Sequence, residues 1–350
     1  MNNLIPTLDA FYDELAPESL APLWTVLRSL VTPEPRTPMA AHRWDYAAVR
    51  TLLLRAGELI SAEQAERRVL ILENPAARGS SAITRTLYAG LQLLLPGEVA
   101  PCHRHTQSAL RFILEGAGAY TAVDGERAVM QPFDLILTPN GRWHDHGNDT
   151  DRAVIWLDGL DIPLVTALDA SFSEHLGGSL QHAATHPDGD CRHRFGANLR
   201  PAFGRAGAPD PVSPLFHYPY ADWREALERV ARASAPDPLE AIRMEFINPL
   251  SGGGVMPTMS AWCHWAPAGF ETAPQRSTDG VIFVVVEGRG RLQTGDRRFD
   301  LKPRDVVVAP AWHSRSLAAE TDLVLFSYSD RATQEKLGLW RAEAVTPPDA

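Results

Sequence analysis

One spacing pattern occurs twice in this 350-residue chain, and it constrains the fold more than any other feature. In the first half, intervals of six, two, four and seven separate Gly97, His103, His105, Ala109 and Gly116. In the second half, the same intervals separate Gly269, Gln275, Ser277, Val281 and Gly288. An aspartate and a proline then bracket a short apolar run in each half, at Asp134–Pro139 and Asp305–Pro310. Duplication of one structural unit explains this pattern best.

Short apolar or alternating runs surround both copies and are broken by Gly, Pro, Asn and Asp. Such runs predict antiparallel strands of a barrel or sandwich, whereas helical spacing of apolar residues predicts a helical arm before the first copy. Between the copies sustained periodicity is lost, apart from a helix expected near 222–233. The expected segments are the arm 1–66, the first barrel 67–165, a connection 166–240, the second barrel 241–330 and a tail 331–350.

Composition excludes several classes of protein. The formal net charge of −10 argues against a nucleic-acid partner or an anionic membrane surface, both of which favour basic patches. The N-terminus lacks a basic segment followed by an apolar core, and the longest apolar run, 281–286, is too short to span a bilayer. Three widely spaced cysteines indicate no disulfide framework. We therefore expect a cytoplasmic protein with neither nucleic-acid nor membrane partners.

Three histidines in the first copy form a candidate metal site. His103 and His105 lie two apart in a strand-like segment, so they project from the same face with Cα atoms roughly 6.6 Å apart. His144 follows a turn shaped by Pro139 and Gly141. Three imidazoles so placed can converge on one ion. The alternative is a surface pair on a strand and an unrelated loop histidine.

Strand alternation places further polar residues on the same face as these histidines. Arg111 shares the face of His105, and a buried guanidinium needs an anionic partner, which is either a ligand carboxylate or a structural salt bridge. On the preceding strand, Tyr88, Gly90 and Gln92 share one face by the same alternation.

These motifs resemble those of the cupin family. A glycine, five residues and His-x-His form the first motif, and Pro139, Gly141, His144 and Asn148 stand at the positions of the second. The stretches TRTLYAGLQLLLPGEVAPCHRHTQSALRFILEG and PNGRWHDHGN are similar to the gentisate and salicylate 1,2-dioxygenases, and FYDELAPESLAPLW and QRSTDGVIFVVVEGRG extend the likeness. The resemblance implies an all-β bicupin fold, with two tandem cupin β-barrels behind an N-terminal helical arm.

The resemblance also implies a reaction. Members of the family hold one Fe(II) per chain on three histidines, here His103, His105 and His144, and insert dioxygen between the carboxyl-bearing and hydroxyl-bearing carbons of a 2-hydroxybenzoate. Many other cupins carry a glutamate ligand where this chain has Ala109, so the ion keeps its full charge and favours an anionic, chelating substrate. The implied partners are a small aromatic acid, dioxygen and other copies of the chain, in a tetramer that degrades aromatic compounds.

The resemblance also implies roles for individual residues at positions that match the family. Arg111 and Arg67 are expected to contact the substrate carboxylate, although Arg68 could replace Arg67 after a shift of one residue. Gln92, Tyr88 and Asp158 are expected to line or support the pocket. His146 is expected to take the hydroxyl proton or to bond oxygen; the alternative is a solvent-exposed loop histidine.

Two residues, Val69 and Gly90, bear on which ring substituents the substrate can carry. Val69 offers no polar partner to a ring 5-hydroxyl, and Gly90 is expected to leave space beside the ring. The three-histidine site beside Arg111 favours a 2-hydroxybenzoate, and gentisate or another 5-substituted salicylate, such as 5-nitrosalicylate, is expected. Val69 and Gly90 favour tolerance of salicylates that lack the 5-hydroxyl; 1-hydroxy-2-naphthoate and unsubstituted salicylate are alternatives.

Two other classes of cupin remain, sugar-phosphate isomerases and non-catalytic ligand-binding proteins. The second barrel is expected to hold no metal and to be structural. Gln275 and Ser277 replace the histidine pair there, and His313 lies two residues out of step with His144.

Overall fold

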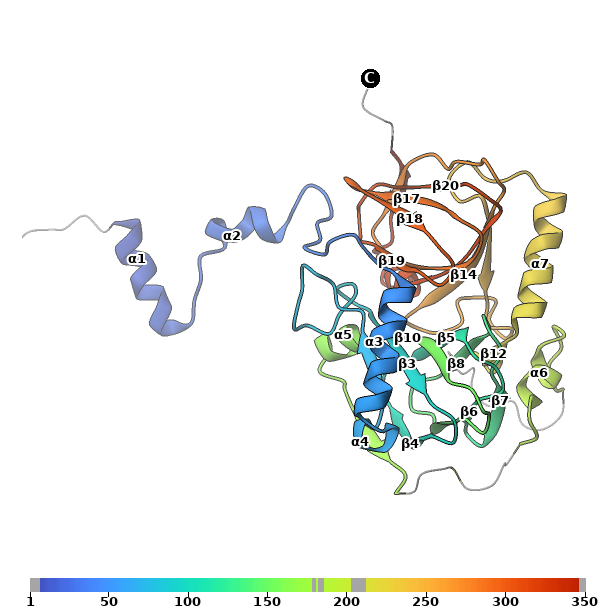
Figure 1. Cartoon of the computed structure of the whole chain (residues 1–350). Helices are drawn as coiled ribbons and strands as arrows, with labels where there is room; N and C mark the ends of the chain where they lie inside the picture. The colour runs from blue at the N-terminus through green and yellow to red at the C-terminus, as the bar shows by residue number, and fades with distance from the viewer. Residues whose placement is uncertain (1–6, 178–180, 182–185, 203–211, 346–350) are drawn as a thin grey trace, which may run out of the picture. The chain divides into compact units, whose positions relative to one another are not determined.

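The computed structural model describes residues 7–177, 181, 186–202 and 212–345 (Figure 1). The chain divides into two compact units, Met1–Arg36 and Thr37–Ala350. The first unit contains α1 (Leu8–Leu15), a 3-10 turn η1 (Ala16–Glu18) and α2 (Leu23–Leu30). Trp24 Nε1 donates a hydrogen bond of 2.9 Å to the Tyr12 hydroxyl and thereby ties the two helices together.

The first barrel of the second unit consists of two antiparallel sheets, which bring together strands far apart in sequence. One sheet has the order β12-β8-β5-β10-β3-β2 and the other β11-β4-β9-β6-β7. The strands are β2 (Val69–Ile71), β3 (Tyr88–Leu94), β4 (Val99–His105), β5 (Ala109–Glu115), β6 (Tyr120–Val123), β7 (Glu126–Val129), β8 (Leu135–Thr138), β9 (His144–Gly147), β10 (Val154–Leu160), β11 (Ser173–His175) and β12 (His217–Tyr218).

The second barrel repeats this plan with the sheet orders β1-β19-β16-β21-β14-β13 and β18-β17-β20-β15-β22. Its strands are β1 (His42–Trp44), β13 (Ile242–Phe246), β14 (Ser260–Ala266), β15 (Gln275–Ser277), β16 (Val281–Glu287), β17 (Gly290–Thr294), β18 (Arg297–Leu301), β19 (Val306–Ala309), β20 (Arg315–Ala319), β21 (Leu323–Ser329) and β22 (Ala342–Ala344). The predicted fold class, two tandem β-barrels preceded by helices, is confirmed.

Each barrel also receives a strand from chain outside it. β1 precedes the first barrel in sequence but pairs with β19 of the second, with Trp44 opposite Val306. β12 belongs to the connection and pairs with β8 of the first barrel, with His217 opposite Ile136. The sequence indicated only helices before the first barrel, because a strand of three residues is too short to show alternation.

Helices flank the barrels. They are α3 (Tyr46–Leu59), α4 (Ala62–Ala65), α5 (Ile162–Ala167), α6 (Asp190–Phe195), α7 (Tyr220–Ala233) and α8 (Arg331–Lys336). The side chain of Asp45 caps α3 by accepting a 3.2 Å hydrogen bond from the amide of Ala48. In Figure 1, α3 and α7 run along opposite sides of the stacked barrels. No helix among the described residues is long and apolar enough to cross a bilayer.

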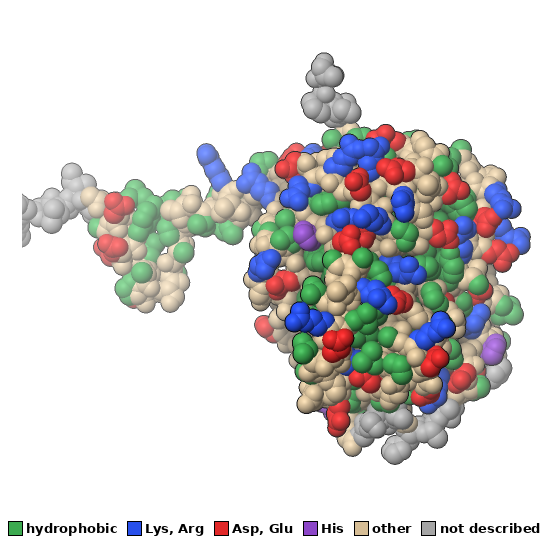
Figure 2. Space-filling view, in the orientation of Figure 1, with side chains coloured by type: hydrophobic (Ala, Val, Ile, Leu, Met, Phe, Trp, Pro, Cys, Tyr) green, Lys and Arg blue, Asp and Glu red, His purple; other side chains and the backbone are tan. Residues whose placement is uncertain are grey.

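The core lies between the six-stranded sheets of the two barrels. Phe112 of β5 stacks on Phe326 of β21 at 4.1 Å between ring centroids, and both side chains are buried. Successive strand residues point to opposite faces, so Phe112 faces the neighbouring barrel and Arg111 faces the interior of its own. The visible outer surface, by contrast, carries interspersed acidic and basic side chains (Figure 2). The alternation expected for β5 therefore directs a cation into the first barrel.

Candidate metal centre and substrate pocket

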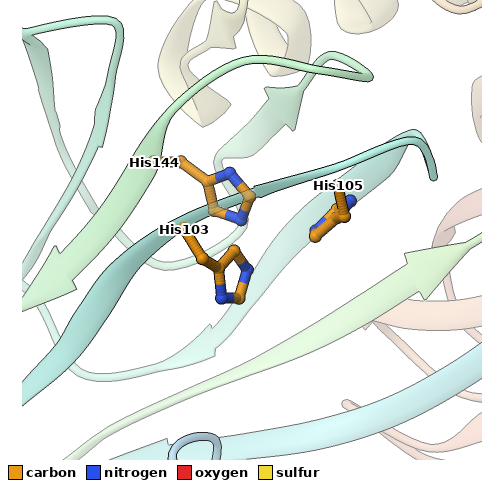
Figure 3. Close-up of side chains that lie close together, drawn as sticks. All are labelled: His103, His105 and His144. Carbon is orange, nitrogen blue, oxygen red and sulfur yellow. The ribbon is translucent and has the colours of Figure 1, made fainter. Parts of the chain in front are cut away.

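His103, His105 and His144 come together on one sheet of the first barrel. His103 and His105 lie on β4, and pairing of β4 with β9 sets His144 opposite His103. Their candidate ligand atoms all lie within 4.8 Å of one another. The three rings face one another from the two neighbouring strands (Figure 3). The sequence-predicted triad is therefore brought together.

Backbone carbonyls orient two of these rings. His105 Nδ1 donates to the carbonyl of Gln107 at 2.8 Å, and His144 Nδ1 donates to the carbonyl of Arg142 at 3.0 Å. A carbonyl can only accept, so each ring keeps a lone pair on Nε2. The Nε2 atom of His144 is buried and has no hydrogen-bond partner in the described structure. A metal ion would satisfy this atom, so the residues fit the ion that the family implies.

All three imidazoles are held neutral, which is the form that binds metal. Burial, followed by the charge of Arg67, lowers the pKa of His103 to about 2. Burial lowers the pKa of His105 to about 4 and that of His144 well below its ordinary value. Protons therefore do not compete for these nitrogens near neutral pH.

No carboxylate among the described residues joins this cluster. Ala109 occupies the position where many cupins have glutamate, and Glu115 at the end of the same strand points elsewhere. The Glu115 carboxylate accepts hydrogen bonds from Tyr46 at 2.9 Å and from Arg50 Nε at 2.6 Å. These partners belong to α3, so Glu115 cannot act as a fourth ligand.

Arg111 lies buried on the neighbouring sheet, paired with Asp158 of β10. The two residues are directly opposite each other, with 3.3 Å between Arg111 Nε and Asp158 Oδ1. Arg111 also donates to the hydroxyl of Thr138. Burial raises the pKa of Asp158 to about 6, although Arg111 opposes this shift. The guanidinium is thus held in place inside the barrel.

The structure distinguishes between the two candidate arginines that precede β2. Arg67 Nη2 lies 3.1 Å from His103 Nδ1 and donates to the carbonyl of Pro101 at 2.7 Å. Arg68 is buried on the other side, where it forms an ion pair with Glu98. Burial and the nearby charge of Arg111 lower the pKa of Arg67 to about 10. Arg67, and not Arg68, therefore faces the histidine cluster.

His146 projects from the same face of β9 as His144. Its Nδ1 lies 2.9 Å from Thr121 Oγ1, and this hydroxyl donates to the sulfur of Met130 at 3.7 Å. The ring therefore donates from Nδ1 and keeps a lone pair on Nε2, which is buried and without a partner among the described residues. Burial also lowers the pKa of His146. His146 is consequently not a solvent-exposed loop histidine.

Comparison with known proteins identifies the family. Residues 90–160 match the cupin domain family. Gentisate 1,2 dioxygenase 1 of Aquipseudomonas alcaligenes is 50% identical over 95% of this chain and 94% of its own length. For the 5-aminosalicylate 1,2-dioxygenase of a Comamonas species, the identity is 36% over 97% of this chain and 91% of that protein. The chain belongs to the gentisate and salicylate 1,2-dioxygenase family. It is an aromatic ring-cleaving dioxygenase.

A solved structure of the same family supports this assignment. The salicylate 1,2-dioxygenase of Pseudoaminobacter salicylatoxidans, determined with gentisate, superposes with a TM-score of 0.92 at 34% identity. The match covers 99% of this chain and 96% of that one. The substrate of this dioxygenase is accordingly a small aromatic acid.

In this dioxygenase, Val69, Tyr88 and Gly90 form one contact cluster beside Asp158. Gly90 pairs with Asp158 across β3 and β10. A Cβ atom at Gly90 would lie 2.5 Å from Val69 Cγ1 and 2.6 Å from the Tyr88 hydroxyl. The expectation that Gly90 leaves open space is therefore wrong in this structure, because Tyr88 and Val69 fill that space. Gln92 lies two residues farther along β3 and is buried.

Several site residues of this dioxygenase were missed by sequence reasoning. Thr138 and Thr121 fix the side chains of Arg111 and His146, but isolated threonines in strands carry no recognisable signal. His175 of β11 lies opposite His103, at 6.0 Å between ring centroids. Its strand lies in the connection, where the sequence shows no periodicity. Only tertiary pairing reveals these positions.

Proposed function

We propose that this dioxygenase binds one Fe(II) per chain through His103, His105 and His144, and cleaves a 2-hydroxybenzoate between its carboxyl-bearing and hydroxyl-bearing carbons. The observation that carries the proposal is the buried Nε2 of His144, which has no hydrogen-bond partner among the described residues, within a cluster of three neutral imidazoles. Three neutral ligands leave the charge of a bound cation uncompensated, which favours an anionic substrate. When bound, the iron supplies the redox chemistry that allows dioxygen to react with the ring.

Substrate capture is assigned to Arg111 and Arg67. The charges of both guanidinium groups act on the histidine cluster, and burial together with the charge of Arg111 lowers the pKa of Arg67. A carboxylate placed between them relieves this repulsion and accepts charge-assisted hydrogen bonds. Asp158 orients Arg111 from the opposite strand, so we propose a supporting role for it.

His146 is assigned to the substrate hydroxyl. Thr121 holds the ring through Nδ1, and the buried Nε2 is left as an acceptor on the ligand face of β9. An acceptor at this place can take a hydrogen bond from the phenolic hydroxyl and orient it next to the carboxylate. Tyr88 and Gln92 complete the wall of the pocket from β3.

For the ring substituent we propose gentisate or another 5-substituted salicylate such as 5-nitrosalicylate. Val69 lies at the Tyr88–Gly90 cluster and presents only methyl groups, so a 5-hydroxyl would not be required for binding. Turnover of salicylate itself or of 1-hydroxy-2-naphthoate is the second candidate, and the same apolar Val69 favours it.

We further propose that catalysis belongs to the first barrel and that the enzyme is a cytoplasmic homotetramer. The three cysteines are free and buried, as suits a reducing compartment. The helices of the first unit expose large apolar side chains, including Trp24 at 62% and Leu30 at 66%. Burial of these side chains against other copies would be favourable.

The proposal is tested by iron analysis followed by anaerobic mixing with gentisate and then oxygen uptake. We expect about one iron per chain, and consumption of one dioxygen per gentisate. Zinc in place of iron without oxygen uptake would point to an isomerase, while gentisate binding without turnover would point to a ligand-binding cupin. Either result would overturn the proposed activity.

A further inference from the structure

The second barrel places an arginine where the first barrel places a metal ligand. Arg315 follows Pro310 by five residues, as His144 follows Pro139. β20 pairs with β15 so that Arg315 lies opposite Gln275, just as His144 lies opposite His103. The guanidinium of Arg315 therefore occupies the position in the second barrel that corresponds to the candidate metal ligand His144 in the first.

The residue of the second barrel that corresponds to His105 forms a hydrogen bond with Arg315. Ser277 corresponds to His105 in the repeated spacing, and its hydroxyl accepts a 2.8 Å hydrogen bond from Arg315 Nη1. Arg315 is only 9% exposed. The second copy has thus replaced three imidazoles by Gln, Ser and Arg at the same place in the barrel.

A cavity of about 470 Å³ opens in front of Arg315. Its lining includes Trp262, His264, Gln275, Phe283 and Ser327. The strand registers place Trp262 opposite Ser327 and Ser327 opposite Phe283, so these three form one row across β14, β21 and β16. Cavities of this size are typical of sites for small molecules.

The corresponding row in the first barrel is polar. There Gly90, Asp158 and Arg111 lie side by side across β3, β10 and β5. The two barrels therefore differ in which strands supply the positive charge and which supply the facing side chains. In the second barrel the positive charge comes from the β15–β20 sheet, and the facing row offers two aromatic side chains with a serine between them.

Arg315 retains hydrogen-bonding capacity toward this cavity. A guanidinium has five N–H donors, and the hydrogen bond to Ser277 uses one of them. No carboxylate within the described part of the chain lies within ion-pair distance of Arg315. Buried Asp279 is close enough for the charge of Arg315 to help lower the pKa of its carboxyl group, but its oxygens accept hydrogen bonds from the hydroxyl of Ser329 at 2.6 Å and from Trp340 Nε1 at 3.1 Å.

The other arginines that line the cavity have carboxylate partners. Arg243 pairs with Glu240 at 2.8 Å, and Arg331 pairs with Glu335 at 2.7 Å. Among the described arginines that line the cavity, Arg315 is thus the one without a carboxylate within ion-pair distance.

We propose that the second barrel is a metal-free binding site for a small aromatic carboxylate, with the carboxylate on Arg315 and the ring over Ser327 between Trp262 and Phe283. The planar fork of arginine suits a carboxylate. Trp262 and Phe283 lie on strands separated by β21, so their backbones are about 9.6 Å apart, a spacing that admits one ring between the two side chains. The inference is independent of the iron chemistry proposed for the first barrel, and it gives the second barrel a role beyond the structural one expected from the sequence.

The test is an anaerobic calorimetric titration of the iron-loaded enzyme with salicylate. We expect two molecules bound per chain in the wild type and one in Arg315→Gln, with unchanged iron content in the variant. Arg315→Lys, which keeps the charge, should weaken second-site binding less than Arg315→Gln does. Benzoate should bind the second site as well as salicylate does, because no ion there requires an ortho hydroxyl; phenol should not bind it.

Failure of the wild type to bind benzoate would overturn the proposal, and this result requires no variant to fold. Equal binding of phenol and benzoate at the second site would overturn carboxylate recognition by Arg315. Neither outcome bears on oxygen uptake or iron content, so failure of this inference is distinguishable from failure of the proposed ring cleavage.

Discussion

Arg111 and Asp158 face each other across β5 and β10 with 3.3 Å between Nε and Oδ1, in a barrel interior that excludes most water. Neither residue is more than 5% exposed. The charge of Arg111 also helps lower the pKa values of His105 and His144, so this cation lies close to the histidine cluster. Removal of the Arg111 side chain should therefore affect substrate binding.

Arg111→Ala is expected to weaken substrate capture while leaving iron bound. Loss of a charge-assisted pair in a dry pocket costs about 3 kcal/mol, or roughly a hundredfold in kcat/KM. Steady-state oxygen uptake and iron analysis measure both effects. The exposed Arg127 of the same barrel provides the control variant Arg127→Ala, for which we expect normal kinetics. Normal kinetics in Arg111→Ala would show that this arginine is structural.

His144→Ala is expected to abolish iron binding, because the buried lone pair at Nε2 disappears and two imidazoles remain. His313→Ala is the matched control, since His313 lies near the corresponding turn of the second barrel but outside the cluster. Iron per chain should fall to near zero in the first variant and stay near one in the second. Loss of iron in His313→Ala alone would move the metal site to the second barrel.

Gly90→Ala is expected to change substrate preference. The new methyl group would meet Val69 and the Tyr88 hydroxyl at 2.5 and 2.6 Å, so Tyr88 must shift. Changes of one methyl group in a pocket typically alter discrimination by about tenfold or more. Relative kcat/KM should be compared for gentisate, salicylate, 5-nitrosalicylate, 1-hydroxy-2-naphthoate and catechol.

The control for this substitution is Gly253→Ala, whose Cβ atom would meet nothing closer than 3.6 Å. Unchanged preferences in Gly90→Ala would remove the Tyr88–Gly90–Val69 cluster from the determinants of specificity. Turnover of catechol with none of the salicylates would contradict the assignment of Arg111 and Arg67 to a carboxylate.

Asp158 should impose a pH dependence on stability. Burial raises its pKa from 3.8 to about 6 in the folded state, so the folded chain binds more protons than the unfolded chain between these values. The free energy of unfolding should therefore fall as pH rises through this window. In Asp158→Asn that contribution is absent, and the fall should be shallower.

Urea denaturation at several pH values between about 4 and 7 measures this slope. Asp151→Asn, at a side chain that is 93% exposed, serves as the control and should follow the wild type. Identical slopes for wild type and Asp158→Asn would show that folding does not raise the pKa of Asp158.

Light scattering should show an assembly of several chains, with a tetramer expected. Leu27 is 45% exposed on α2, beside the more exposed Trp24, so Leu27→Glu should weaken the assembly by placing a charge in an apolar contact. Arg28→Glu, on the same helix, is the control that changes charge without removing apolar surface. A stable wild-type monomer near 38.4 kDa would contradict the prediction.

The fold was predictable because strands repeat every two residues and because duplication preserved spacing. The same periodicity identified His103, His105 and Arg111 as residues of one interior, since a strand fixes which side chains share a face. Strand periodicity did not predict side-chain positions that depend on tertiary contacts. The choice between Arg67 and Arg68 depends on a one-residue shift before β2. In the second barrel, the residue that pairs with Gln275 is Arg315, two residues beyond His313, and spacing alone does not identify it.

Other features leave no trace in a single sequence. That Tyr88 and Val69 occupy the space over Gly90 depends on the pairing of β2 with β3, which places Ile71 opposite Gly90 and Val69 opposite Gln92. Side-chain packing of this kind follows from the assembled sheet and has no local signature.

The exchange of β1 and β12 between the barrels makes the duplicated halves inseparable. Cleavage of the chain within the connection before His217 would leave β1 without β19 as its neighbour and deprive β8 of β12. Both fragments would then expose unpaired backbone along a hydrophobic sheet, which promotes aggregation. A protein with a single barrel of this plan would need a second copy to supply the missing strand, so the tandem arrangement provides within one polypeptide the strand that a swapped dimer would otherwise provide.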